Sequence, residues 1–150
     1  MKPSPRPVLL ALLFAVLAHA SADDLDPTRF IGMDLRSAVD SLGLPRDMFT
    51  FRGEEETQDN VVFYYSDSLY LFWYRNRVWQ VRCDHRFSGS VLGLSLGMSR
   101  EEVERAFPAT LTAVGDSLYF DLQGRSPPMR VRMVFTLKLL SDLYVYRSDF

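Results

Sequence analysis

The chain has 150 residues, with 17 Lys and Arg against 19 Asp and Glu, 11 Phe, 7 Tyr, 2 Trp and a single cysteine, Cys83. The aromatic content excludes a disordered chain, and the slightly negative net charge excludes a general phosphate-binding surface, so we expect no nucleic-acid partner. A lone cysteine excludes an intramolecular disulfide, so packing of apolar side chains must supply the stability.

The N-terminal segment has the pattern of a secretory signal. Lys2 and Arg6 give it a basic start, and residues 8–18 form an unbroken apolar run. That run is shorter than the roughly 20 residues needed to cross a bilayer core. Small residues then allow cleavage after Ala20 or Ala22.

We therefore predict that residues 1–22 are a signal peptide and that residues 23–150 form a single domain in the periplasm or outside the cell. The alternative is an uncleaved N-terminal anchor. No cysteine lies near the cleavage site, so we expect no lipid anchor.

Two similar segments predict the starts of two helices. Ile-Gly-Met-Asp-Leu-Arg-Ser-Ala begins at Ile31, and Leu-Gly-Met-Ser-Arg-Glu-Glu-Val begins at Leu96. Asp34 and Ser99 suit the N-cap position because a short side-chain oxygen accepts a free first-turn N–H. Ser99 also has Glu102 three residues later, which is the pattern of a reciprocal capping box.

Each predicted helix has one apolar face. Residues four apart share a helix face, and the apolar pairs here are Ala38 with Leu42 and Val103 with Phe107. Gly43 ends the first helix and Pro108 the second. Two capped helices that open two similar halves indicate tandem repeats.

After each helix the apolar period changes to two, which predicts strands. They cover residues 61–65, 69–74 and 78–83 in the first half, and residues 117–122, 129–137 and 140–147 in the second. Phe49 and Phe51 allow one further short strand before an acidic loop over residues 53–60. The predicted fold class is α+β: two tandem repeats, residues 30–83 and 94–147, each a helix plus a three-stranded meander, in an antiparallel sheet with the helices on one face.

The turn at residues 75–77 decides which side chains face outward. With a three-residue turn, Tyr74 pairs with Val78. One face then holds Leu69, Leu71, Trp73, Trp79, Val81 and Cys83 as core, and the other holds Tyr70, Phe72, Tyr74, Val78, Gln80 and Arg82. In the second half, Leu143 and Val145 point inward, while Tyr144 and Tyr146 point outward beside Arg130 and Arg132.

These outward side chains form the candidate site. Tyr and Arg combine a large contact area with a polar group, and they are enriched at protein–protein hot spots. The predicted protein-binding residues are Tyr70, Phe72, Tyr74, Arg130, Arg132, Tyr144 and Tyr146. The alternative is that the N-terminal arm or the other half simply covers Tyr70 and Phe72.

Catalytic and metal-binding patterns are missing from the sequence. His85 is the only histidine after the leader, and with Cys83 it is too little for a zinc site. Cys83 and His85 are also poorly placed for a thiolate–imidazole pair, because neighbouring strand residues rarely reach hydrogen-bonding geometry. The run Glu54-Glu55-Glu56 with Asp59 lacks the ligand spacing of a calcium loop. We expect no enzyme activity, no metal and no cofactor.

The motif Gly-Met-Ser-x-Glu-Glu-Val that starts at Gly97, followed by a short meander, resembles the repeat of the BLIP-like superfamily. That superfamily includes the β-lactamase inhibitor proteins and the SmpA/OmlA lipoproteins of outer-membrane assembly. The resemblance covers residues 30–83 and 94–147. The chain lacks the disulfides of the inhibitors and the lipidated cysteine of the lipoproteins. The resemblance implies a fold and a protein-binding role.

Three functions are compared on this basis. We expect a non-enzymatic module that binds another envelope or secreted protein. The first alternative is a periplasmic carrier of a small ligand or lipid, with an apolar cleft between the halves. The second is a small outer-membrane β-barrel, suggested by the alternation in residues 143–146 and by Phe150. It is disfavoured because lipid would then contact Arg130 and Arg132.

Overall fold

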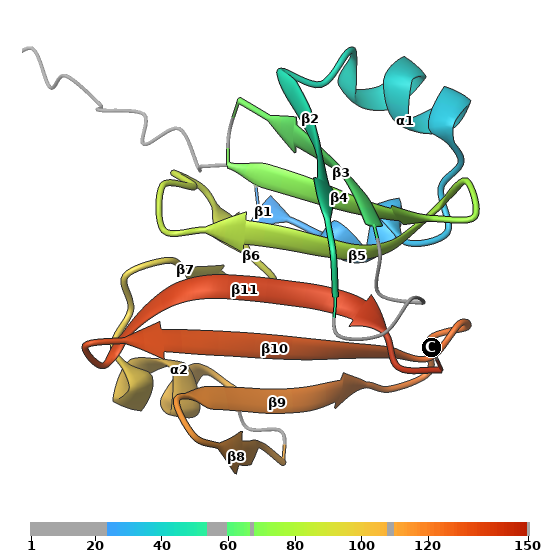
Figure 1. Cartoon of the computed structure of the whole chain (residues 1–150). Coiled ribbons are helices and arrows are strands. Elements are labelled where there is room, and N and C mark those ends of the chain that lie inside the picture. Colours follow the sequence, from blue (N-terminus) through green and yellow to red (C-terminus); the bar gives the residue numbers. More distant parts are fainter. Residues whose placement is uncertain (1–23, 54–59, 67, 108–109, 150) are drawn as a thin grey trace, which may run out of the picture.

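The structure is a computed structural model that describes residues 24–53, 60–66, 68–107 and 110–149. The expected signal peptide, and Glu54 to Asp59 of the acidic loop, lie outside the described residues. The fold is α+β, as predicted, with α1 (Leu35–Leu42), α2 (Arg100–Ala106) and an eight-stranded antiparallel sheet (Figure 1).

The strand order shows how the two halves join. Across the sheet it is β2 (Asp47–Phe51), β3 (Asn60–Tyr65), β4 (Leu69–Tyr74), β5 (Arg77–Asp84), β11 (Leu139–Arg147), β10 (Met129–Thr136), β9 (Ser117–Leu122) and β8 (Thr112–Val114). Each helix is therefore followed by four strands of this sheet. Strand β2 confirms the further short strand that Phe49 and Phe51 allow, whereas the expectation of three strands in the second half is wrong. Strand β8 escapes the sequence pattern because it has three residues, all exposed. The halves meet where β5 pairs with β11.

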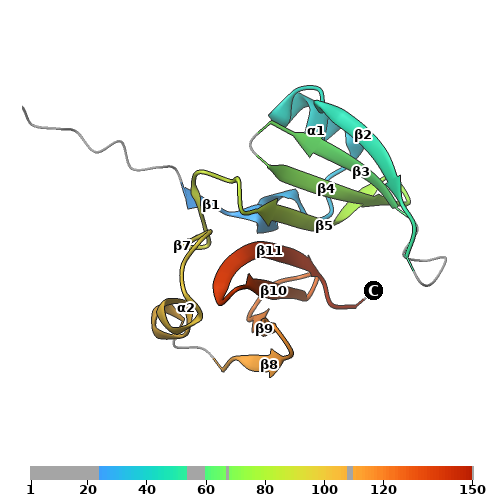
Figure 2. The same cartoon turned by 60° about the vertical axis from the view of Figure 1, so that its left-hand side comes forward.

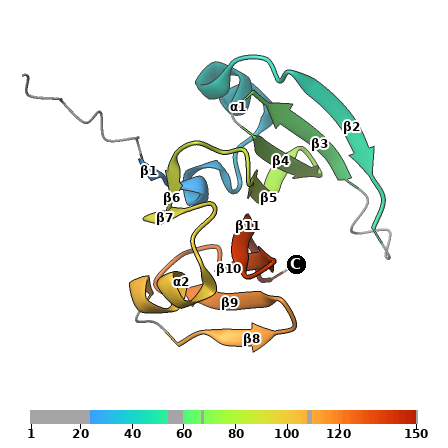
Figure 3. The ribbon, with the colours of Figure 1, turned by 90° about the vertical axis from the view of Figure 1, so that its left-hand side faces the viewer.

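The sheet separates a helix side from a concave side. Figure 3 shows α1 and α2 on one side, with the outer strands β2 and β8 turned toward the other. A small sheet of β1 (Asp24–Leu25), β6 (Ser90–Val91) and β7 (Leu94–Ser95), together with the 3-10 helix η1 (Pro27–Phe30), lies on the helix side (Figure 2). These short elements were not predicted, because two-residue strands carry no periodic signal.

A continuous apolar core fills the helix side and includes both halves. Ala38 of α1 and Val103 of α2 are both 0% exposed and belong to the same cluster of buried side chains. Cys83 belongs to this cluster too, which confirms that it is a buried apolar side chain. Burial raises the pKa of its thiol to about 12, so the thiol stays protonated at neutral pH.

Both helix starts are capped as predicted. The Asp34 carboxylate accepts a hydrogen bond from the backbone N–H of Ser37 at 2.8 Å. At α2, Ser99 Oγ accepts from the Glu102 N–H at 3.2 Å, while Glu102 Oε2 accepts from the Ser99 N–H at 2.8 Å. Gly43 ends α1 with a φ of 77°, a conformation that glycine adopts without strain.

Backbone hydrogen bonds fix the start of each helix to the sheet. In the first half, Gly32 N–H donates to Val78 O at 2.7 Å, and Val78 N–H donates to Met33 O at 3.0 Å. The second half has the same two bonds, from Gly97 to Leu140 and from Leu140 to Met98, each of 2.8 Å. The chain before α1 is therefore attached to β5, and the chain before α2 to β11.

The turn between β4 and β5 differs from the prediction. Arg75 and Asn76 both have positive φ, 46° and 60°, so the turn has two residues and not three. Tyr74 consequently pairs with Arg77, not with Val78. Arginine rarely adopts positive φ, which is why the sequence pattern did not indicate this turn.

A β-bulge next to this turn reverses two predicted orientations. The register shifts between Phe72 and Trp73, so that Trp73 pairs with Val78 while Phe72 pairs with Gln80. Val78 therefore lies in the helix-side core, and Trp79 packs on the concave side. The sequence pattern predicts the opposite face for each of them, and both predictions are wrong.

The buried face of α2 gives a stability test. Val103→Asp should lower the free energy of unfolding by about 3 kcal/mol, because it places a carboxylate in an apolar core without a partner. Ser99→Ala should cost about 1 kcal/mol through loss of the cap. Urea unfolding followed by circular dichroism measures both changes. Glu104→Gln, at an exposed position of the same helix, serves as the control with little expected effect. Unfolding of Val103→Asp at the parent urea midpoint would contradict the packing of α2.

Candidate functional site

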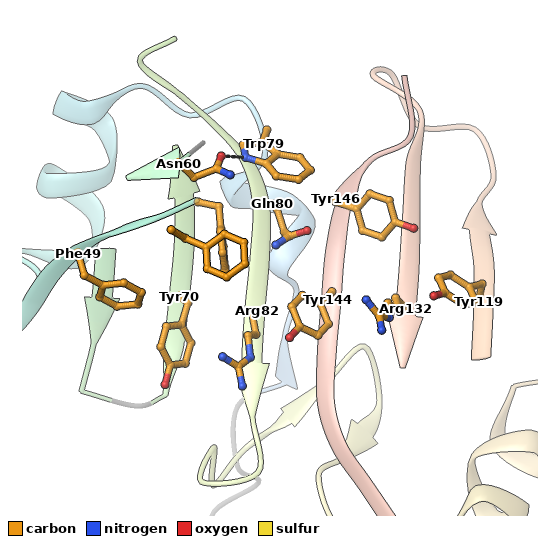
Figure 4. Close-up of a pocket in the computed structure, with 12 residues that line it drawn as sticks. Phe49, Asn60, Tyr70, Trp79, Gln80, Arg82, Tyr119, Arg132, Tyr144 and Tyr146 are labelled. Atoms are coloured by element: carbon orange, nitrogen blue, oxygen red, sulfur yellow. Dashed lines mark hydrogen bonds between the residues drawn. The ribbon is translucent and has the colours of Figure 1, made fainter. Parts of the chain in front are cut away.

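A row of tyrosine and arginine side chains crosses the concave face. Successive strands pair so that its members lie opposite one another, in the order Tyr64, Tyr70, Arg82, Tyr144, Arg132 and Tyr119. We call this row the aromatic–arginine ladder. Figure 4 shows five of its members side by side, from Tyr70 to Tyr119.

Each guanidinium of the ladder lies between two aromatic rings. Arg82 Cζ is 4.9 Å from the ring centroid of Tyr70 and 5.7 Å from that of Tyr144. Arg132 Cζ is 5.7 Å from the Tyr144 centroid and 5.9 Å from the Tyr119 centroid. These distances allow cation–π attraction, so the positive charges and the rings hold each other in place.

Carboxylates neutralise two arginines of this face. Arg82 Nε donates to Asp142 Oδ1 at 2.8 Å. Burial alone would lower the pKa of Arg82, but its hydrogen bond to Asp142 keeps that pKa above the ordinary value. Arg130 donates to both oxygens of Asp121, at 2.7 and 3.0 Å, and this contact lowers the pKa of Asp121.

Arg132 has a different environment. Its Nε donates to Ser117 Oγ at 3.3 Å. Within the described ranges its guanidinium forms no ion pair, although it is exposed. The ladder therefore carries one positive charge that no described carboxylate balances.

A polar network around the buried Asp84 holds one end of the ladder. Tyr70 Oη donates to Asp84 Oδ2 at 2.7 Å, and Arg86 Nη2 donates to both of these oxygens, also at 2.7 Å. Burial alone would raise the pKa of Asp84, but the hydrogen bonds from Arg86 and Tyr70 hold it below the ordinary value. Burial and the bond to Asp84 raise the pKa of Tyr70.

The ladder forms part of a groove of about 420 Å³. Its lining comes from both halves and consists of Phe49, Phe51, Asn60, Tyr70, Phe72, Trp79, Gln80, Arg82, Tyr119, Arg132, Tyr144 and Tyr146. Trp79 Nε1 donates to Asn60 Oδ1, as the dashed line in Figure 4 shows. The volume lies within the range of about 300–1,000 Å³ that is typical of ligand sites.

The structure brings most of the predicted residues together. Tyr70, Phe72, Arg132, Tyr144 and Tyr146 all line the groove. The other two do not line it. Tyr74 lies near the end of β4 against the guanidinium of Arg75, at 5.2 Å, and Arg130 binds Asp121.

Tyr70 and Phe72 are each only 8% exposed. Their neighbours on the sheet cover them: the Tyr64 ring lies 4.9 Å from Tyr70, and the Phe51 ring lies 6.3 Å from Phe72. This cover comes from β2 and β3, within the same half. The half-buried Tyr144 and Tyr146 therefore offer more ring surface to a partner than Tyr70 does.

Several groove residues were missed at the level of sequence. The sequence pattern predicts Trp79 in the core because it does not indicate the bulge. Tyr119 alternates with the buried Leu118 and Phe120, so its outward orientation was available from the period of its strand. Phe49 and Phe51 lie on β2, all five residues of which are exposed, so no alternation of buried and exposed positions indicates their orientation.

The described residues were also compared with the requirements of a metal site, a reactive thiol and a membrane-spanning helix. Among them, no three His, Cys, Asp or Glu side chains gather closely enough to hold a metal ion. Cys83 points into the core and is 1% exposed. None of the helices in the described ranges has the length and apolar character that a membrane crossing requires.

Comparisons with known proteins give a fold and not a family. No family model and no curated protein matches the sequence. The fold is similar to that of a cysteine-rich secretory protein from Staphylococcus aureus subsp. aureus Mu50, with a TM-score of 0.54 and 14% identity over 85% of this chain and 48% of that one. It is also similar to an extracellular protein containing a SCP domain from Bacillus anthracis str. Ames, with a TM-score of 0.54 and 12% identity over 99% of this chain and 51% of that one. The chain thus spans about half the length of either structure.

These matches correct the family resemblance. The structural neighbours are proteins of the cysteine-rich secretory type, so the resemblance to the BLIP-like superfamily and to SmpA/OmlA is wrong. The motif that suggested it contains the capping box of Ser99 and Glu102. A capping box encodes the start of a helix in any fold, so it does not identify a family.

The Asp84 network gives a pH-dependent prediction. Asp84→Asn should lower the free energy of unfolding by about 2 kcal/mol at pH 7, because it removes the charge that accepts hydrogen bonds from Tyr70 and Arg86 at a buried position while retaining one acceptor oxygen. The folded-state pKa of Asp84 lies below its unfolded value, so its contribution is complete above about pH 4 and is lost as the pH falls through the folded-state pKa. Urea midpoints of parent and variant should therefore converge below about pH 4. A difference that stays constant between pH 7 and pH 3 would contradict the network.

Proposed function

We propose that this protein is an exported, non-enzymatic recognition domain that binds a segment of another envelope or secreted protein in the groove on its concave face. The observation that carries the proposal is the aromatic–arginine ladder, which lies in a groove instead of under a helix. Export is supported by the N-terminal pattern and is consistent with neighbours described as secretory or extracellular.

The ladder has the physical properties of a preformed binding surface. Tyrosine side chains have few rotatable bonds, so fixing them against a partner costs little entropy. Tyr144 already lies between Arg82 and Arg132, which reduces the ordering that binding would require. Its half-buried ring keeps some surface available for contact.

We also propose that the two halves are tandem repeats. Each half has the same two backbone hydrogen bonds before its helix. The hairpin of β10 and β11 turns at Leu137 and Lys138, both with positive φ, as the hairpin of β4 and β5 does. Both hairpins have a register shift in the same place, between Phe72 and Trp73 and between Val134 and Phe135. On this interpretation the groove lies at the junction of two repeats.

One observation favours the second candidate, a carrier of a small ligand or lipid. The groove is lined by residues of both halves, as a cleft between halves would be. Native mass spectrometry of the exported protein distinguishes the two functions. A bound non-peptide molecule that is released on denaturation would support the carrier.

Site-specific photo-crosslinking tests the recognition function. With a photo-crosslinking amino acid in place of Tyr146, we expect an adduct with a second polypeptide in the native host, because this position lines the groove. The control position is Arg36, which is exposed on α1 on the helix side. Tyr144→Ala should reduce the adduct about tenfold, the typical effect of truncating a hot-spot aromatic.

The pattern of adducts decides between outcomes. An adduct at position 146 that is much stronger than at position 36 supports the proposal. Equal adducts at both positions, or an added mass that is not a polypeptide, would count against it.

A further inference from the structure

Arg132 stands out because its neighbours on the concave face are neutralised and it is not. Arg130, two residues away on the same strand, binds both oxygens of Asp121. Arg82, two strands away, binds Asp142. In the described part of the chain, Arg132 has one side-chain acceptor, Ser117 Oγ, and no carboxylate partner.

The guanidinium of Arg132 is nevertheless held in a defined place. Figure 4 shows it between Tyr144 and Tyr119 in the lining of the groove. Stacking and the bond from Nε to Ser117 leave its two Nη groups without an acceptor among the described residues. A planar guanidinium with free Nη donors matches the geometry of a carboxylate.

The charge balance indicates the sign of the ligand. The pairs of Arg82 with Asp142 and of Arg130 with Asp121 are neutral. Arg132 then leaves a local positive charge in a chain whose net charge is −2. A negatively charged group is therefore the electrostatic complement of this groove.

We propose that Arg132 recognises a carboxylate of the partner polypeptide, while an aromatic or apolar side chain beside that carboxylate packs on the rings that line the groove. This inference rests on the proposed function and adds the chemistry of the bound segment. Tyr146 lines the groove and pairs with Arg130, which lies two residues from Arg132 on the same strand. The Tyr146 ring is therefore close to the Arg132 guanidinium.

A polypeptide fits this face better than a saccharide does. Hydroxyl-rich ligands need carboxylates or amides that are ready to accept hydrogen bonds. Here Asp142 and Asp121 are engaged by arginines, Asn60 accepts from Trp79, and Gln80 is left as the one lining amide without a side-chain hydrogen bond to a described residue. Most of the remaining lining is aromatic surface and the Arg132 guanidinium, which suit an apolar side chain next to a carboxylate.

A pair of small probes tests the inference. N-acetyl-tryptophan carries a carboxylate next to an indole, and N-acetyl-tryptophanamide is its neutral counterpart. Titration of the isotopically labelled full domain, followed by NMR, should show binding of the acid about three- to tenfold tighter than binding of the amide. The resonances that shift should include Trp79 Nε1–H and Arg132 Nε–H.

Variants test whether the preference for the acid over the amide depends on the Arg132 side chain. Arg132→Gln should bind the acid and the amide equally, with an otherwise unchanged spectrum that shows an intact fold. Arg132→Lys keeps the charge but loses the planar fork, so its preference for the acid should be intermediate. Arg36→Gln removes a positive charge on the helix side and should keep the full preference.

The outcomes separate this inference from the proposed function. Equal binding of acid and amide to the parent protein, or no saturable binding of either, would overturn the role of Arg132, while crosslinking at position 146 would still test protein recognition. Shifts reproduced by sodium sulfate alone would reveal general anion binding and would also overturn it. Tighter binding of galacturonate than of N-acetyl-tryptophan would indicate that the ligand is an acidic saccharide and would overturn the proposal of a polypeptide.

Discussion

The pairing of β5 with β11 is the constraint on which the concave face depends. It places Arg82 opposite Tyr144, and this register extends the ladder from one half into the other. The same register places Asp84 opposite Asp142, an arrangement of like charges that is unfavourable on its own. Arg86 and Tyr70 bind the carboxylate of Asp84, and Arg82 binds that of Asp142. These contacts offset the repulsion between the two carboxylates.

The two faces of the sheet have different physical roles. On the helix side, closely packed apolar residues of both halves provide most of the stability through burial. On the concave side, a smaller cluster of Val62, Tyr70 and Phe72 is combined with charged groups that are held by rings and carboxylates. Such a face is ordered without being fully covered, as the proposed binding role requires.

Features of the fold that depend on local chemistry could be predicted from the sequence. The caps at Asp34 and Ser99 follow from side-chain hydrogen bonding, and the strands follow from the period of their apolar residues. The bulge beside Trp73 and the contact of β5 with β11 depend on long-range register, which no local pattern encodes. For this reason the predicted site contained Tyr144 and Arg132 but lacked Trp79, and it included Tyr74, which does not line the groove.

The position of β11 has a consequence for how the chain acquires its structure. This strand is the last of the domain in chain order, yet it lies in the middle of the sheet, between β5 and β10. Strands β2 to β5 can pair as soon as residues 47–84 are available, but the edge of β5 stays open until residues 139–147 pair with it. While that edge is open, an unpaired central strand is accessible to wrong pairing, and a contact of such high sequence separation forms slowly.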